Sequence, residues 1–210
     1  MNITCNPRAF GAGTRLMGEV QWRRGDMNAA LAHVERAVVL APGFDLARDF
    51  LIRLLLQNNR LSEALAHAET LARSPIHNPG YDLIRASVLV RLGDQDAARA
   101  IYESLLADRP DQPQVWQNLG HALKTLGRQA DAVHAYRQAV HHRPTMGEAW
   151  WSLANLKTVT LDAADIATME QALETLARDG QTEGEDVFHL HFSLGKAQED
   201  RKADEAAFRH

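Results

Sequence analysis

The stretch PQVWQNLGHALKTLGRQADAVHAYRQAVHHRPTM, residues 113–146, is one period of a 34-residue pattern that repeats along the chain. Within this period, Trp116 is the fourth residue, Gly120 the eighth, Ala132 the twentieth, Tyr136 the twenty-fourth and Pro144 the thirty-second. The three preceding windows of 34 residues align with this period position by position, without an insertion. The twentieth slot then holds an alanine in all four frames, namely Ala30, Ala64, Ala98 and Ala132.

The spacing of small and large residues predicts pairs of antiparallel helices. Small side chains at the eighth and twentieth slots let two helices approach closely, and large ones at the fourth, seventh and twenty-fourth slots fill the space between pairs. Gly25, Asn59, Gly93 and Gly127 stand where each pair must turn, since glycine and asparagine adopt the left-handed conformation that ends a helix. Prolines near the end of each period stop the second helix. We therefore predict four hairpins over residues 11–44, 45–78, 79–112 and 113–146.

The pattern resembles the tetratricopeptide repeat (TPR), and the residues Trp116, Leu119–Gly120, Ala132, Tyr136 and Pro144 lie close to that family's consensus. The resemblance implies an all-α fold, a right-handed superhelix in which hairpins stack because a single hairpin cannot bury its apolar face alone.

The two ends of the chain depart from the period. We expect residues 1–10 to form an irregular leader, 147–187 a degenerate fifth hairpin and 188–210 a truncated sixth one. Within the fifth, Asp162 is placed to cap a helix that runs to Ala177. Because the chain stops three residues after Ala207, we interpret it as an excised piece of a longer protein. The alternative is a native C-terminal capping helix that ends early.

Three segments of the C-terminal third carry a second resemblance. They are EAWWSLANLKT at 148–158, DIATME at 165–170 and LHFSLGKAQED at 190–200. In this order they look like the junction of bacterial TPR-containing sulfotransferases, where a repeat array leads into a sulfotransferase domain. The resemblance implies a scaffold role for this segment and a phosphoadenosine phosphosulfate site in a domain after residue 210. The alternative is a stand-alone bacterial TPR adaptor with no enzymatic domain.

The sequence of residues 1–210 contains no motif of a catalytic, cofactor-binding or metal-binding site. A donor phosphate needs a loop of backbone amides at a helix N-terminus after a strand, and no such unit is present. The ten histidines have no metal-ligand spacing, so we predict neither a metal, a cofactor nor a catalytic residue here. The net charge of -4 gives no footprint for nucleic acid or an anionic membrane.

Composition indicates an ordinary soluble protein in a reducing compartment. Of the 210 residues, 45% are hydrophobic and 24% charged, and no apolar run is long enough for a membrane span. Cys5 is the only cysteine, so no intramolecular disulfide can form. We therefore predict a cytoplasmic location.

The resemblance to TPR proteins also predicts where a partner would bind. In that family the second, fifth, ninth, twelfth and thirteenth residues of each first helix line a concave groove. The site residues that we single out are Arg15, Arg23, Asp49, Arg53, Arg91, Gln117, His121, Lys124, Trp151 and Asn155. The same slots also hold Glu19, Trp22, Gln57, Gln114 and Glu148.

Recurring basic residues in this groove favour a protein or peptide ligand with acidic character. A solvated face with no dedicated ligand is the alternative. A chaperone-type carboxylate clamp is disfavoured, because Leu83 and Ser87 stand where that clamp requires Lys and Asn. We thus predict a protein-interaction scaffold, with a homodimer as a further possibility.

Overall fold

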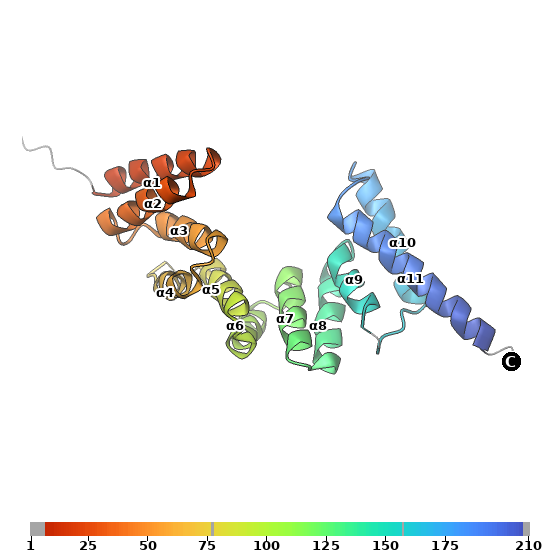
Figure 1. The fold of residues 1–210 in the computed structure, drawn as a ribbon. Helices are drawn as coiled ribbons and strands as arrows, with labels where there is room; N and C mark the ends of the chain where they lie inside the picture. Colours follow the sequence, from red (N-terminus) through yellow and green to blue (C-terminus); the bar gives the residue numbers. More distant parts are fainter. Residues whose placement is uncertain (1–6, 77, 157, 208–210) are drawn as a thin grey trace, which may run out of the picture. The chain divides into compact units, whose positions relative to one another are not determined.

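The computed structural model describes residues 7–76, 78–156 and 158–207, and every regular element in these ranges is a helix (Figure 1). The prediction of an all-α fold is confirmed. The chain divides into two compact units, Met1–Ile101 and Tyr102–His210, so that one helix contributes to both. Unit 1 contains α1 (Pro7–Arg23), α2 (Met27–Leu40), α3 (Asp45–Gln57), α4 (Leu61–Ala72), α5 (Pro79–Leu92) and the start of α6 (Gln95–Asp108). Unit 2 contains the rest of α6, α7 (Pro113–Thr125), α8 (Gln129–His142), α9 (Gly147–Ala154), α10 (Ala163–Arg178) and α11 (Glu185–Ala207).

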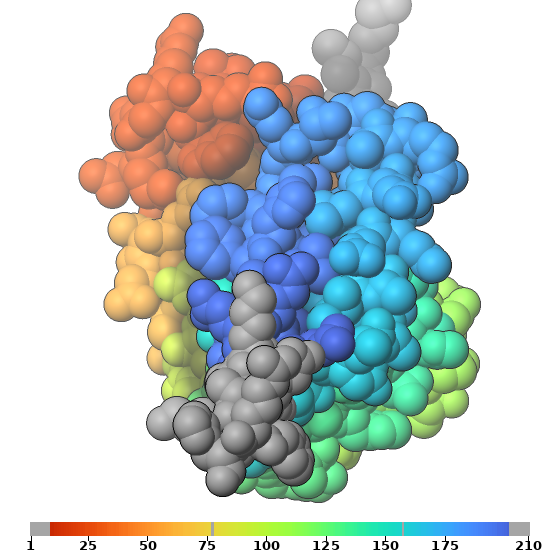
Figure 2. Space-filling model, turned by 90° about the vertical axis from the view of Figure 1, so that its right-hand side faces the viewer, coloured from red at the N-terminus to blue at the C-terminus, as the bar shows by residue number. Residues whose placement is uncertain are grey.

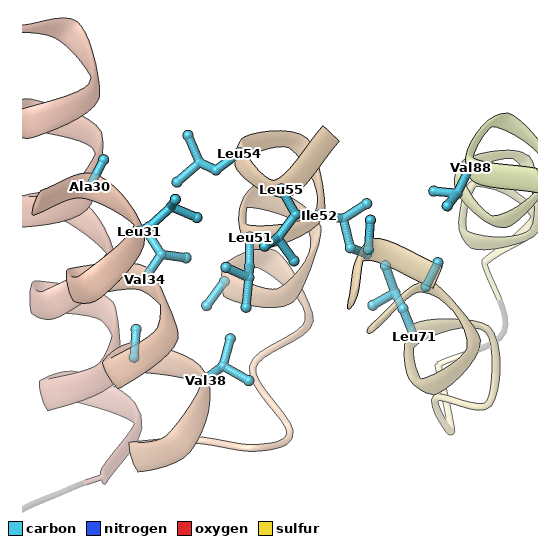
Figure 3. Packing of buried hydrophobic residues seen from close by; sticks show 14 residues of the cluster. Ala30, Leu31, Val34, Val38, Leu51, Ile52, Leu54, Leu55, Leu71 and Val88 are labelled. Carbon is cyan, nitrogen blue, oxygen red and sulfur yellow. The ribbon is translucent and has the colours of Figure 1, made fainter. Parts of the chain in front are cut away.

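Successive helices of unit 1 pack on one another from α1 to α5. Its core lies mainly between α2 and α3, where leucine, isoleucine and valine side chains interdigitate, and it reaches Leu71 of α4 and Val88 of α5 (Figure 3). All of these side chains are almost fully buried. Each fully buried aliphatic side chain stabilises the fold by about 1.5–3 kcal/mol relative to an exposed one.

The turns inside the hairpins lie at the predicted residues. Gly25, Asn59, Gly93 and Gly127 have φ values of 84°, 56°, 86° and 77°, all in the left-handed region. Asn59 is the sole non-glycine with a positive φ among the residues that the structure describes. Asparagine tolerates this conformation better than other residues with a side chain, which explains its place in the turn between α3 and α4.

The small residues of the eighth slot allow two helices to touch. A Cβ atom added at Gly120 of α7 would lie 2.5 Å from Cε1 of Tyr136 on α8. One added at Gly18 of α1 would meet the Val34 side chain of α2 just as closely. Both partners occupy the twenty-fourth slot of the same repeat, so the predicted close approach is confirmed in these two hairpins.

In three repeats, the side chain at the fourth slot donates a hydrogen bond to the carbonyl of the proline six residues before it. The indole Nε1 of Trp116 donates a hydrogen bond to the carbonyl of Pro110 at 2.7 Å, and Trp150 does the same to Pro144 at 2.9 Å. In the second repeat, which lies in unit 1, the fourth slot holds Arg48, whose Nη2 donates to the Pro42 carbonyl at 2.8 Å. Each bond ties a first helix to the proline loop before it. Arg48 thus replaces tryptophan in this role, and its guanidinium is also 3.1 Å from Nδ1 of His67.

In the C-terminal part, α9 packs mainly against α11. The backbone N–H of Gly147, at the start of α9, donates to Oδ1 of Asp186 at 2.9 Å. Met146, the residue before α9, provides no side-chain cap, so the Asp186 carboxylate satisfies this free N–H from another helix. A side chain at Gly147 would collide with the Asp186 backbone, which makes glycine necessary there.

An ion pair joins α8 to α10. Arg137 contacts both carboxylate oxygens of Asp165, the second at 2.9 Å from its Nη2. Asp165 also forms a capping box with Asp162, the predicted helix cap. The helix begins at Ala163 and ends at Arg178, so the helix predicted from Asp162 to Ala177 is confirmed.

Two predictions about the ends are wrong. The first helix begins at Pro7, so residues 7–10 are helical rather than irregular; residues 1–6 lie outside the described residues. The truncated sixth hairpin is absent from the described part of 188–210, because α11 continues through Ala207 without a turn. The residues from 196 to 207 include no glycine, proline or asparagine that would end the helix. Gly195 has no atom within 4 Å of an added Cβ, so it is not a close-approach position.

Candidate partner-binding surfaces

The predicted groove residues of α1 and α3 lie together in unit 1. They line an open pocket of about 580 Å³ together with three apolar residues. Those from the predicted groove slots are Arg15, Glu19, Trp22, Asp49, Arg53 and Gln57. The apolar ones are Leu46, which also occupies a groove slot as the second residue of its repeat, and Phe50 and Leu54, which do not. We call this region the α1/α3 pocket.

Trp22 joins the two helices of the α1/α3 pocket. Its indole Nε1 donates to Oε1 of Gln57 at 2.9 Å, and its ring meets Phe50 edge-on at a centroid distance of 6.1 Å. The residue still exposes 39% of its surface, so one part of the ring is free for a ligand. Phe50 was not predicted as a groove residue, because it occupies the sixth slot of its helix and the family's groove positions do not include that slot.

The charged side chains of the α1/α3 pocket pair with one another or with Arg23. Glu19 accepts from Arg23 at 2.8 Å and lies 3.4 Å from Arg15. Asp49 accepts two hydrogen bonds from Arg53, at 2.8 and 3.3 Å. The side chains of Arg23 and Arg53 are 71% and 69% exposed, and exposed pairs of this kind contribute at most about 1 kcal/mol. A ligand carboxylate can therefore take over either guanidinium with little loss of stability.

Arg91 is the remaining predicted groove residue of unit 1. It lies in the last turn of α5 with an exposed side chain. No ion pair holds it among the residues described. The five predicted residues of unit 1 thus comprise Asp49 and four arginines, of which only Arg91 is unpaired in the described ranges.

In unit 2, the predicted residues of α7 belong mainly to a partly buried network. Gln117 exposes only 2% of its surface, and its Nε2 lies 3.4 Å from Nε2 of His121. His121 Nδ1 is 2.9 Å from the hydroxyl of Tyr136, and its Nε2 is 3.5 Å from Oε1 of Glu148. Gln117 therefore presents little surface to a partner. Lys124, one turn further, is exposed and has no ion pair in the described part of the chain.

Burial sets the protonation of this network. It raises the pKa of Tyr136 to about 12, so the phenol keeps its proton. It lowers the pKa of His121, against the opposing effect of Glu148, so the imidazole is neutral at neutral pH. The neutral ring can accept from the phenol at Nδ1 and carry its proton on Nε2, toward Glu148, or it can accept from the Gln117 amide at Nε2 and donate from Nδ1 to the phenol oxygen, but not both.

The remaining predicted residues, Trp151 and Asn155, lie on α9. Asn155 follows the last residue of the helix, and its Nδ2 donates to the Trp151 carbonyl at 2.8 Å. The Trp151 ring contacts Phe192 and His189 of α11. These two residues were missed, because the frame assigned to 188–210 gave no reason to place them beside α9. The predicted set is thus distributed over both units, and Arg15, Asp49 and Arg53 are the members that line the α1/α3 pocket.

Neither a metal site nor a membrane span is visible in the ranges that the structure describes. No three His, Cys, Asp or Glu side chains there are placed to hold a metal ion. None of the described helices combines the length and the apolar character that crossing a bilayer requires. Cys5 lies outside the described residues.

Family models identify the repeats directly. A model described as Tetratricopeptide repeat matches residues 79–122, and a second one with the same description matches residues 113–141.

One curated relative is Cytochrome c-type biogenesis protein CycH of Rhizobium meliloti (strain 1021). It is 28% identical over 143 residues, which are 66% of this chain and 37% of the relative. The chain therefore spans little more than a third of that relative's length. These relationships do not support the resemblance to sulfotransferases.

Solved structures share the fold. MamA from Desulfovibrio magneticus RS-1 has a TM-score of 0.60 at 13% identity, covering 92% of this chain and 96% of its own. TTC0263, a thermophilic TPR protein in Thermus thermophilus, has a TM-score of 0.59 at 21% identity, covering 90% and 98%. YrrB, described as a TPR protein with an unusual peptide-binding site, has a TM-score of 0.56 at 14% identity, covering 94% and 91%. The chain therefore contains tetratricopeptide repeats and has the fold of a tetratricopeptide-repeat solenoid.

Proposed function

We propose that this protein is an interaction scaffold and that its α1/α3 pocket binds an acidic, extended peptide segment of a partner. The observation that carries the proposal is the pocket itself, in which a partly exposed tryptophan lies with Arg15 and Arg53. With Arg23 included, these side chains present three guanidinium groups against the two carboxylates of Glu19 and Asp49. One positive charge therefore remains for a ligand, and the phenyl and indole rings provide apolar contact area.

The similar proteins support the role of an interaction scaffold, and they say less about the ligand and the pocket that binds it. YrrB, which shares the fold and whose description names a peptide-binding site, agrees with a peptide ligand. The match to CycH agrees with the alternative of an adaptor that carries no sulfotransferase domain, and we favour that alternative. The sulfotransferase domain after residue 210, the homodimer and the cytoplasmic location stay predictions.

Panning of a random peptide library against the purified protein tests the proposal. We expect the retained peptides to be enriched in Asp and Glu and to lose affinity when Arg53→Glu is introduced. Arg36→Glu is the matched control, because Arg36 lies on α2 and does not line the α1/α3 pocket. If acidic peptides bind both variants as tightly as the wild type, the pocket assignment is wrong.

A further inference from the structure

Four aromatic rings gather on the surface of unit 2. Trp151 of α9 and Phe188, His189 and Phe192 of α11 form what we call the aromatic cluster. The centroids of Phe188 and Phe192 are 4.6 Å apart, and that of Trp151 lies 5.6 Å from Phe192 and 6.2 Å from His189. Phe188 exposes 61% of its surface and Phe192 exposes 49%. Helix α11, drawn in blue, lies at the surface facing the viewer in Figure 2.

The two phenylalanines lie outside the buried face of α11. The buried face of this helix is formed by Leu190, Ser193, Leu194 and Ala197. Phe188 and Phe192 are four residues apart, so they share a different face of the helix. Contiguous exposed rings at such a position are typical of an interaction site.

A carboxylate stands one helical turn before the aromatic cluster on each of its two helices. Glu148 precedes Trp151 by one helical turn on α9, and Glu185 precedes Phe188 by one turn on α11. Both line a pocket of about 300 Å³ that also contains Glu183, Asp186 and, as its single basic residue, Arg143. Asp186 accepts a hydrogen bond from the backbone N–H of Gly147 on α9. The side chain of Glu148 is 52% exposed, and Glu183 and Glu185 are exposed as well.

We propose that the aromatic cluster and the neighbouring carboxylates of Glu148, Glu183 and Glu185 bind a cationic segment of a protein partner, through arginine or lysine side chains. The ring faces attract a cation electrostatically, and the glutamates add charge-assisted hydrogen bonds. The excess of negative charge selects this occupant over an acidic peptide or an anionic lipid surface. The site goes beyond the proposed function, because it shares no residue with the α1/α3 pocket and has the opposite charge preference.

A random peptide phage library, panned against the full chain, provides the test. The comparison is between the wild type and the double variant Phe188→Ser/Phe192→Ser, both of whose changes are at exposed positions. His191→Ser is the matched control, since His191 is exposed on the same helix outside the aromatic cluster. Circular dichroism checks that all variants keep their helix content.

We expect the peptides that bind the wild type and the control, but not the double variant, to be enriched in Arg and Lys. By fluorescence anisotropy their affinity falls about 5- to 30-fold in the double variant, as the loss of two exposed cation–π contacts implies. Glu183→Lys/Glu185→Lys weakens the same peptides, and Arg53→Glu leaves them unchanged. The unchanged affinity of the Arg53→Glu variant separates this site from the α1/α3 pocket. If the α1/α3 pocket proves not to bind acidic peptides, the present proposal is unaffected.

Three outcomes would overturn the proposal. The first is that the peptides that require the two phenylalanines prove apolar or acidic, without enrichment of basic residues. The second is that no retained peptide depends on the two phenylalanines. The third is that sedimentation shows self-association through these residues, which would make the aromatic cluster an interface between two copies.

Discussion

Gly120 and Gly195 offer a matched pair of substitutions to alanine with opposite expected effects. Both glycines lie inside helices, α7 and α11. In a helix interior, replacing glycine by alanine stabilises by about 1 kcal/mol when space is available. That gain applies to Gly195, whose added Cβ has no neighbour within 4 Å.

At Gly120 the added methyl group meets the Tyr136 ring, with Cε1, Cδ1 and Cζ at 2.5, 2.6 and 2.9 Å. Tyr136 is fully buried and bonded to His121, so its ring cannot move aside freely. Overpacking of this kind destabilises by about 1–3 kcal/mol, and a lost hydrogen bond adds roughly 1 kcal/mol. After subtraction of the propensity gain, we expect Gly120→Ala to destabilise by about 1–3 kcal/mol and Gly120→Leu by more.

Urea denaturation followed by circular dichroism measures both effects. Hydrogen exchange of α7 and α8 amides locates the loss in the hairpin that contains Gly120. A Gly120→Ala protein that gains as much stability as Gly195→Ala would refute the close approach of α7 and α8.

Three further predictions concern the repeat framework, the groove and pH. Trp116→Phe keeps an aromatic ring but removes the indole hydrogen bond to the preceding loop, so we expect a loss of about 0.5–1.5 kcal/mol in urea denaturation. The triple variant Arg53→Glu, Arg91→Glu, Lys124→Glu should abolish binding of acidic library peptides with an unchanged circular dichroism spectrum; unchanged affinity would contradict the groove assignment. The lowered pKa of His121 means that the unfolded chain binds its proton first as pH falls below about 6.5. The wild type should therefore lose more stability than His121→Gln between neutral pH and lower pH, and parallel losses would argue against the partly buried network around His121.

The 34-residue period predicted what depends on local chemistry. The turns at Asn59 and the glycines follow from backbone preference, and the contact of Gly120 with Tyr136 follows from the small and large slots of one hairpin. The helix that begins after Asp162 was predictable for the same reason, since its cap and its apolar face are both local signals.

What the sequence did not reveal depends on contacts between distant segments. Arg48 does not resemble the tryptophans of the same slot, yet its long side chain reaches the equivalent carbonyl. The ion pair of Arg137 with Asp165 joins residues 28 positions apart. The partnership of α9 with α11 follows from Asp186 and Gly147, and neither residue stands out until the two helices are side by side.

The predicted groove residues fall into two groups, those that line a pocket and those that neighbouring side chains bury. Trp22 and Arg53 both line the α1/α3 pocket, because α1 and α3 keep the regular period. Gln117 is buried instead, and His121, one turn further along the same helix, provides it with a polar partner. A slot rule gives the direction of a side chain but not whether a neighbour covers it.

The central claim, that a partner segment binds the α1/α3 pocket, is tested most directly by NMR with an acidic peptide from the library. As the peptide is added, we expect the indole N–H signal of Trp22 and the Nε–H signal of Arg53 to shift first and most. Saturating shifts confined to α2 and α4, with both side-chain signals unmoved, would contradict the claim.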